Sequence, residues 1–184
     1  MTGSRLAPGR TAFLDRDGTI NTAAAEGDYV DDPDYVSLLP GAAEAINRLN
    51  RRGNPVVVVT NQRGISLGLM SEADLEAVNR RLIELLAAGG AKLDAIYYCP
   101  HAAGSCDCRK PGPGMFLRAE RELPGVSIGG GAMVGDSALD IEAGDRLGLT
   151  TVRIGPEAPG EIAADRVTGN LLEGVDWLLA PGDA

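Results

Sequence analysis

Short apolar runs alternate with segments of helical periodicity along most of the chain. The apolar runs predict β-strands at Thr11–Asp15, Pro55–Thr60, Leu93–Cys99, Ala132–Gly135 and Thr151–Ile154. Within the second of them, Val56 to Val59 are apolar without interruption, which is typical of a parallel strand that is buried on both faces.

In the segments between these runs, apolar residues recur at steps of three and four, which predicts amphipathic helices. The expected helices are Gly41–Arg52, Ser71–Ala88, Met115–Leu123, Ala138–Leu147 and Asn170–Leu179. Ser71 fits an N-cap because Asp74 follows it three residues later. Alternating strands and helices predict one three-layer, Rossmann-like α/β domain with a mostly parallel sheet.

We expect this domain to span residues 11–180, between a flexible N-terminus at 1–10 and a tail at 181–184. A chain of 184 residues has room for one such domain and its core. Only 42 residues separate Asp17 from Thr60, and the helix Gly41–Arg52 takes up part of them, so we expect no cap domain there. Nothing in the sequence specifies an oligomer, and we expect a monomer.

Composition and charge exclude several kinds of partner. The formal net charge is −9, which repels nucleic acid phosphates at long range. No apolar run approaches the ~18 residues of a membrane span, and the first ten residues have no apolar region typical of a signal peptide. We therefore expect neither nucleic acid nor a membrane as a partner, and a cytoplasmic location.

Two aspartates follow the first predicted strand, in the segment FLDRDGT. Asp15 and Asp17 are two residues apart, so on extended backbone their carboxylates point to the same side. Their mutual repulsion favours a hard divalent ion between them, and Mg²⁺ is the natural one. The alternatives are a solvated turn or a calcium loop. A calcium loop needs glycine at its sixth position, whereas Gly18 is the fourth residue from Asp15.

Polar residues also follow three later strands or the loops after them. Thr60, Asn61 and Gln62 end the valine-rich strand, and Arg109 with Lys110 offers cations. Asp136 follows the segment AMVG, and Asp140 comes four residues later. Carboxyl ends of parallel strands meet at one edge of a sheet, so these groups are expected to surround one phosphate.

The motifs FLDRDGT, VVTN, RKP and VGDSALD, in this order, resemble those of the haloacid dehalogenase superfamily. The resemblance implies that Asp15 attacks phosphorus as a nucleophile and that Asp17 is the general acid and base. It also implies that Thr60 and Lys110 stabilise the phosphoryl group. Mg²⁺ would be held by Asp15, Asp136 and the main-chain carbonyl of Asp17. Asp140 is interpreted as a carboxylate that braces its own loop.

All three cysteines and the only histidine of the chain fall in one short segment, YYCPHAAGSCDCRKP. Cys99, His101, Cys106 and Cys108 match the number and type of ligands in a closed tetrahedral Zn²⁺ site. The alternative is a buried strand-end cysteine with incidental neighbours. Four protein ligands leave no open position, so this Zn²⁺ would be structural. Its loop at 99–108 would hold Arg109 and Lys110 in place.

DRDGTIN, TNQ-x-GI and the cysteine loop before RKP together resemble the D-glycero-D-manno-heptose-1,7-bisphosphate 7-phosphatase family. This resemblance implies a small phosphorylated sugar as the substrate, bound by Arg109 together with Asn61, Gln62 and Arg63.

The related histidinol-phosphate phosphatases are the main alternative, although Arg63 favours a second anion over a cationic substrate. A catalytically inactive interaction module would lack Asp15, Asp17, Lys110 or Asp136, and all four are present.

Overall fold

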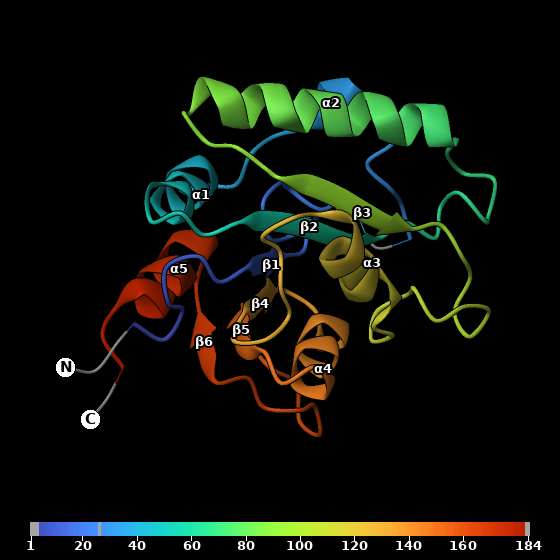
Figure 1. The fold of residues 1–184 in the computed structure, drawn as a ribbon. Coiled ribbons are helices and arrows are strands. Elements are labelled where there is room, and N and C mark those ends of the chain that lie inside the picture. Colours follow the sequence, from blue (N-terminus) through green and yellow to red (C-terminus); the bar gives the residue numbers. More distant parts are fainter. Residues whose placement is uncertain (1–3, 26, 183–184) are drawn as a thin grey trace.

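The computed structural model describes residues 4–25 and 27–182, which form a central sheet covered by helices on both faces (Figure 1). The sheet contains β1 (Ala12–Leu14), β2 (Val56–Asn61), β3 (Ala95–Cys99), β4 (Ala132–Gly135), β5 (Thr150–Ile154) and β6 (Arg166–Thr168). Its strand order is β3-β2-β1-β4-β5-β6, and every neighbouring pair is parallel. The α/β class and the parallel sheet expected from the sequence are confirmed.

Five α-helices and one short 3₁₀ helix accompany these strands in the described part of the chain. They are η1 (Pro33–Tyr35), α1 (Ala42–Arg51), α2 (Glu72–Ala88), α3 (Gly114–Glu122), α4 (Ala138–Arg146) and α5 (Leu171–Leu179). At the start of α2, the Ser71 hydroxyl accepts from the backbone N–H of Asp74, and the Asp74 carboxylate accepts from the backbone N–H of Ser71, which together form a capping box. The helices begin and end within a residue or two of the predicted bounds.

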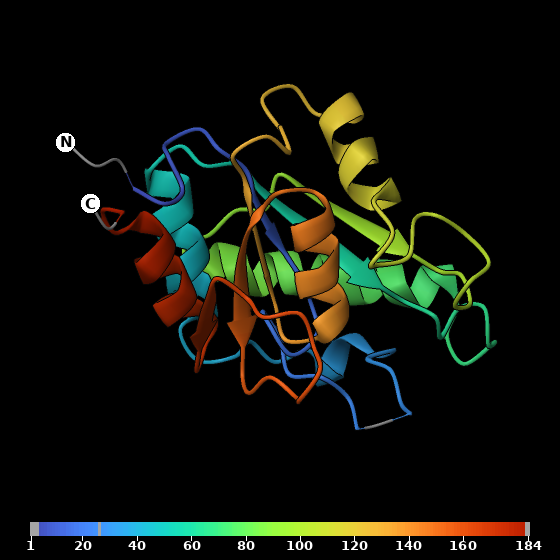
Figure 2. The same ribbon diagram turned by 90° about the horizontal axis from the view of Figure 1, so that it is seen from below.

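Alternate side chains of the central strands β1, β2 and β4 enter two separate cores, which makes the molecule three-layered. Leu14, Val56 and Val58 pack with α1, α2 and α5, whereas Phe13 and Val57 pack with α3 and α4. Figure 2 shows α4 in front of the strands and α2 behind them. Burial on both faces explains why the first four residues of β2 are all valines.

Two short elements were not predicted, namely β6 and η1. β6 has three residues, which are exposed or half-buried, so it carries no hydrophobic alternation. It exists through its parallel pairing with β5, which the local sequence does not encode. Between Gly18 and Pro55, the described residues fold into η1, α1 and loops and contain no inserted domain.

The chain before β1 packs against α5. The backbone N–H of Leu6 donates to the carbonyl of Leu178 at 2.8 Å, and the Leu6 side chain is fully buried. The Arg5 guanidinium lies 4.6 Å from the centroid of the Trp177 ring. The expected boundary at residue 11 therefore leaves out a core residue. Residues 1–3 and 183–184, parts of the expected terminus and tail, lie outside the described residues.

None of the helices in the described ranges combines the length and the apolar character needed to cross a membrane.

Candidate active site

The site lies at the carboxyl ends of β1, β2 and β4. The chain leaves β1 for β2 on one side, and the next strand on the other side is β4, so the direction of strand order changes at β1. Loops diverge at such a point and leave a crevice in parallel sheets. Asp15, Thr60 and Asp136 each stand at or just beyond the end of one of these three strands.

Three carboxylates form a cluster in this crevice. Oxygen atoms of Asp15, Asp136 and Asp140 all lie within 4.8 Å of one another. Burial raises the pKa of Asp15 to about 7, with further contributions from the charges of Asp140 and Asp136, although Lys110 opposes the shift. Burial and the charge of Asp140 likewise raise the pKa of Asp136. Concentrated negative charge of this kind suits a divalent cation.

Lys110 lies among these acids and is 2% exposed. Its Nζ donates to Asp15 Oδ1 at 2.8 Å and to the Val59 carbonyl at 2.7 Å, and it pairs with Asp140 Oδ1 at 2.5 Å. Burial disfavours the charged ammonium, but the charges of Asp140 and Asp15 outweigh this and raise the pKa of Lys110. Its charge is thus held directly beside Asp15.

Asp140 has a larger role than the sequence indicated. It accepts hydrogen bonds from the backbone N–H and the hydroxyl of Ser137, at 3.0 and 2.7 Å, and so braces the start of α4 as expected. Its ion pair with Lys110 and its place in the carboxylate cluster were not predicted. Residues thirty positions apart meet here because the loop of Lys110 and the first turn of α4 converge at the sheet edge.

Two glycines allow the backbone to approach these carboxylates. A Cβ on Gly18, whose φ is +81°, would lie 2.1 Å from Asp136 Oδ2. A Cβ on Gly135 would lie 2.3 Å from Asp140 Oδ2. Any side chain at either position would displace the carboxylate. The place of Gly18 in the site is not evident from the sequence, because it depends on a contact with Asp136 in the loop after β4.

Asp17 does not belong to the carboxylate cluster. The chain bends at Arg16, just beyond the end of β1, and the carboxylates of Asp15 and Asp17 have different partners. The carboxylate of Asp17 instead accepts hydrogen bonds from the guanidinium of Arg16, from Asn21 Nδ2 at 2.8 Å and from Gln62 Nε2 at 2.9 Å. Asp140, and not Asp17, is the third carboxylate of the cluster.

The residues after β2 divide into braces and exposed groups. Gln62 Nε2 donates to the Thr60 hydroxyl at 2.9 Å as well as to Asp17. Asn61 exchanges two hydrogen bonds with the backbone of Lys110, through Oδ1 at 3.0 Å and Nδ2 at 3.2 Å. Asn61 therefore fastens the loop of Lys110 to β2. Arg63 is exposed.

Arg109 is half-buried, and its Nη1 is buried without a hydrogen-bond partner among the described residues. An unpaired buried guanidinium nitrogen is costly, so it marks a place where an anion would be stabilised. Arg109 and the exposed Arg63 are thus two cations that could meet an anion.

The segment after Asp17 forms a wall beside the loop of Arg63. The ring of Tyr29 lies against Gly64, and a Cβ on Gly64 would be 2.8 Å from Cγ of that ring. A cavity of about 470 Å³ opens next to this contact, lined by Thr22–Ala25, Asp28–Asp31, Tyr35 and Leu69. Its first lining residue, Thr22, follows Asn21, which bonds to Asp17.

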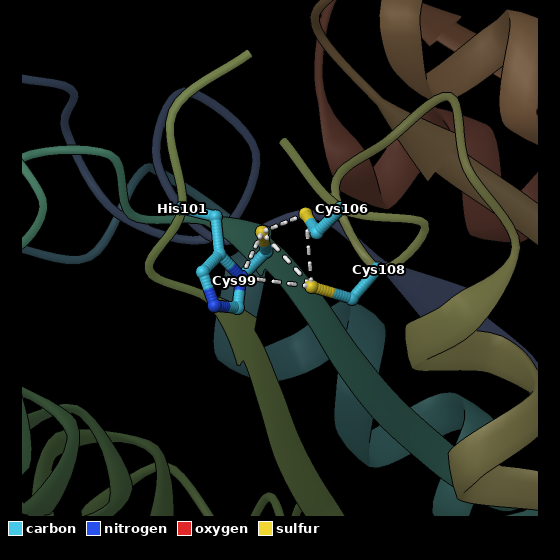
Figure 3. A group of neighbouring side chains, drawn as sticks. All are labelled: Cys99, His101, Cys106 and Cys108. Atoms are coloured by element: carbon cyan, nitrogen blue, oxygen red, sulfur yellow. Dashed lines mark hydrogen bonds between the residues drawn. The ribbon is translucent and has the colours of Figure 1, made fainter. Parts of the chain in front are cut away.

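The four scarce residues gather at the end of β3, as Figure 3 shows. The Sγ atoms of Cys99, Cys106 and Cys108 lie 3.2 to 3.5 Å apart, and His101 presents Nδ1 to Cys99 and Cys108 at 3.6 and 3.2 Å. Around a tetrahedral Zn²⁺ with ordinary bond lengths, ligand atoms are about 3.6 to 3.8 Å apart. No disulfide joins the three thiols. The donor set and spacing fit Zn²⁺.

Burial alone would raise the pKa of the Cys106 thiol. Hydrogen bonds with the Cys108 thiol and the backbone of Arg109 outweigh this effect and lower the pKa to about 7. This favours the thiolate at Cys106, whereas burial raises the pKa of the Cys99 thiol, and burial together with the neighbouring thiols raises that of Cys108. The cluster is also tied to the loop of Arg109 and Lys110, because Cys108 precedes Arg109 and the N–H of Gly114 donates to the Asp107 carbonyl at 3.0 Å. Fixing the cluster therefore fixes the approach to Lys110.

Proteins of similar sequence show the family to which this chain belongs. Residues 5–148 match the family model described as haloacid dehalogenase-like hydrolase. D-glycero-beta-D-manno-heptose-1,7-bisphosphate 7-phosphatase of Escherichia coli O6:H1 is 41% identical over 176 residues, which cover 88% of this chain and 90% of that protein. The protein of the same name from Rhodopseudomonas palustris is 39% identical over 162 residues, covering 83% of this chain and 87% of its own.

A solved structure agrees with these relatives. The crystal structure of D,D-heptose 1,7-bisphosphate phosphatase from B. bronchiseptica, complexed with magnesium and phosphate, superposes with a TM-score of 0.81. It is 34% identical in sequence, and the match covers 92% of this chain and 98% of that one. The chain therefore belongs to the haloacid dehalogenase-like hydrolases, in the family of the heptose bisphosphate phosphatases.

Proposed function

We propose that this protein is a Mg²⁺-dependent phosphatase that removes the 7-phosphate of D-glycero-D-manno-heptose 1,7-bisphosphate through an aspartyl phosphate. The observation that carries the proposal is the pairing of Asp15 with buried Lys110 beside two further carboxylates. It occurs in a chain that is about 40% identical to curated heptose bisphosphate 7-phosphatases along most of its length.

The chemistry of two residues accounts for both halves of the reaction. An oxygen of Asp15 attacks phosphorus, the bond between phosphorus and the sugar oxygen breaks, and Asp17 gives its proton to the departing alkoxide. In the second half, water attacks the phosphorus of the aspartyl phosphate and passes a proton to Asp17. Inorganic phosphate leaves, and Asp15 returns to a carboxylate.

Thr60 and Lys110 would hold the phosphoryl oxygens during both halves. Lys110 already lies 2.8 Å from Asp15, so the same ammonium would contact a phosphoryl group attached to that residue. Because Lys110 and Thr60 are almost fully buried, their contacts act in a medium with little screening.

The carboxylate cluster fits Mg²⁺, which prefers oxygen ligands. Asp15, Asp136 and the main-chain carbonyl of Asp17 would hold it, while Asp140 keeps its bonds to Lys110 and Ser137. When bound, the ion neutralises charge on the phosphoryl oxygens. At the end of β3, Cys99, His101, Cys106 and Cys108 would hold a structural Zn²⁺ that keeps Arg109 and Lys110 in place.

Arg109 and Arg63 would recognise the anionic parts of the small phosphorylated sugar, and the cavity beside Tyr29 offers room for its carbon chain. Asn61 and Gln62 would act on the substrate through the groups that they hold in place. A cytoplasmic monomer with a single domain remains our expectation from the sequence.

A comparison of three substrates tests the proposal. We expect kcat/KM in Mg²⁺ to be at least about tenfold higher for heptose 1,7-bisphosphate than for histidinol phosphate or fructose 1,6-bisphosphate. Histidinol phosphate has no second phosphate to meet an arginine, and the two phosphates of fructose 1,6-bisphosphate are one carbon closer together along the chain. Steady-state phosphate release measures this. If histidinol phosphate were the best substrate, the assignment of the sugar would be wrong, although the aspartyl phosphate mechanism could still hold.

A further inference from the structure

Arg16 has the largest of the fully buried side chains in the described part of the chain. Its position between the two aspartates of the site is unusual for a charged residue, because arginine is rarely buried without a partner. A buried guanidinium is costly unless each of its nitrogens is engaged, so its contacts show what it is for.

All three guanidinium nitrogens of Arg16 donate hydrogen bonds. Nε lies 3.1 Å from Asp17 Oδ1, and Nη2 lies 2.9 Å from Asp17 Oδ2, which makes a bidentate pair. Nη1 donates to Asn79 Oδ1 at 3.0 Å. Asn79 belongs to α2, which lies on one face of the sheet, so the Arg16 fork is anchored outside its own loop.

The carboxylate of Asp17 is correspondingly fixed. In its ionised form, each of its oxygens accepts two hydrogen bonds, Oδ1 from Arg16 and Asn21 and Oδ2 from Arg16 and Gln62. When Asp17 carries the proton that it donates in the proposed reaction, the protonated oxygen gives up one of these partners. A bidentate fork sets the plane of a carboxylate as well as its distance, which a single lysine ammonium does not do. Gln62 also bonds to Thr60, so the carboxylate has a set position relative to the phosphoryl site.

A contribution to stability alone is a weaker explanation. Buried ion pairs often contribute little to stability compared with apolar residues of the same volume. An apolar side chain could fill the space of Arg16, but it would leave Asp17 free to rotate about its side-chain bonds. What the fork adds is orientation, which matters for a group that must exchange a proton with one particular oxygen.

We propose that Arg16 and Asn79 are positioning residues for Asp17, the guanidinium fork setting the plane of the Asp17 carboxylate and Asn79 anchoring that fork to α2. The inference rests on the role that the proposed function gives to Asp17.

Variants of the two residues test the inference. We expect Arg16→Met to lower kcat for a sugar phosphate about 10- to 100-fold while KM changes less than about threefold, because the residue does not touch substrate. Arg16→Lys should restore little of this loss, since an ammonium cannot bond to both oxygens in one plane. Asn79→Leu should lower kcat about three- to tenfold. Arg80→Met, at an exposed arginine next to Asn79 in α2, is the matched control and should leave both constants unchanged.

A double-mutant cycle distinguishes positioning from a general structural effect. If Arg16 acts through Asp17, Arg16→Met should cost less than about threefold when Asp17 is already asparagine. Equal losses in both backgrounds, or full recovery in Arg16→Lys, would overturn the inference. Circular dichroism and the melting temperature establish whether each variant folds. Should Arg16→Met not fold, the cycle with Asn79→Leu and Asp17→Asn decides in the same way.

The choice of substrate separates this inference from the proposed function. The cycle is measured on the best alkyl phosphate of the substrate comparison and on 4-nitrophenyl phosphate, whose leaving group needs no proton. We expect a smaller loss of kcat/KM on 4-nitrophenyl phosphate. If the wild-type protein hydrolysed neither ester, the proposed function would fail. If it hydrolysed both and the cycle were additive, only the inference would fail.

Discussion

Asp15→Asn is expected to lower kcat for phosphate release at least about 10⁴-fold, because an amide cannot form the aspartyl phosphate. The change preserves the size of the side chain and removes its charge. The measurement is steady-state release of inorganic phosphate in saturating Mg²⁺. Asp145→Asn is the matched control, since Asp145 is an exposed aspartate of α4, and it should keep wild-type activity. Retention of more than about one per cent of activity by Asp15→Asn would contradict a nucleophilic role.

The stability of Asp15→Asn should show that its inactivity is not a failure to fold. Burial raises the folded-state pKa of Asp15 from 3.8 to about 7, so the folded protein binds the proton more tightly than the unfolded chain. The ionised form therefore costs stability, and this cost grows as pH rises from about 4 to about 7. At pH 8 in EDTA, the melting temperature of Asp15→Asn should equal or exceed that of the wild type. At pH 4, where Asp15 is protonated in the folded protein, the melting temperatures of Asp15→Asn and the wild type should be nearly equal.

Cys106→Ser is expected to release the metal of the cysteine cluster and to weaken substrate binding. Metal analysis of the wild type should find about one zinc per chain, and the variant should hold much less. We expect a fall in kcat/KM of about 10- to 100-fold, mostly through KM, because Arg109 follows the cluster directly. The melting temperature should fall as well, since metal binding to the folded state stabilises it.

The neighbouring Ser105→Ala serves as the control for Cys106→Ser. Ser105 lies in the same exposed loop, where its hydroxyl donates only to the Ala102 carbonyl at 2.8 Å, so its loss should change neither zinc content nor KM. A zinc-free wild-type preparation with full activity would show that the metal is not needed to hold Arg109 and Lys110 in place.

Local patterns made most of the fold predictable. The strands that were predicted combine dense apolar runs with abrupt polar ends, and the Ser71–Asp74 cap marks the start of α2 to the residue. The cysteine cluster was equally accessible, because its ligands are scarce elsewhere in the chain. β6 escaped because its few exposed residues depend on pairing with β5.

The details of the site were less predictable, for physical reasons that involve distant residues. The ion pair between Lys110 and Asp140 joins a loop to the first turn of α4, and neither segment reveals in sequence that the two side chains meet. Arg16 was overlooked because an arginine beside two aspartates resembles any solvated charge until its burial is known. Asp17 lies outside the carboxylate cluster because the chain bends at Arg16 and its carboxylate bonds to Arg16, Asn21 and Gln62, which the motif FLDRDGT does not show.

The most direct test of the central claim is to follow D-glycero-D-manno-heptose 1,7-bisphosphate by ³¹P NMR in the presence of the protein and Mg²⁺. We predict that the signal of the 7-phosphate disappears as inorganic phosphate accumulates, while the signal of the phosphate at C1 persists. Loss of the C1 phosphate first, or an unchanged spectrum from protein that hydrolyses other esters, would contradict the account.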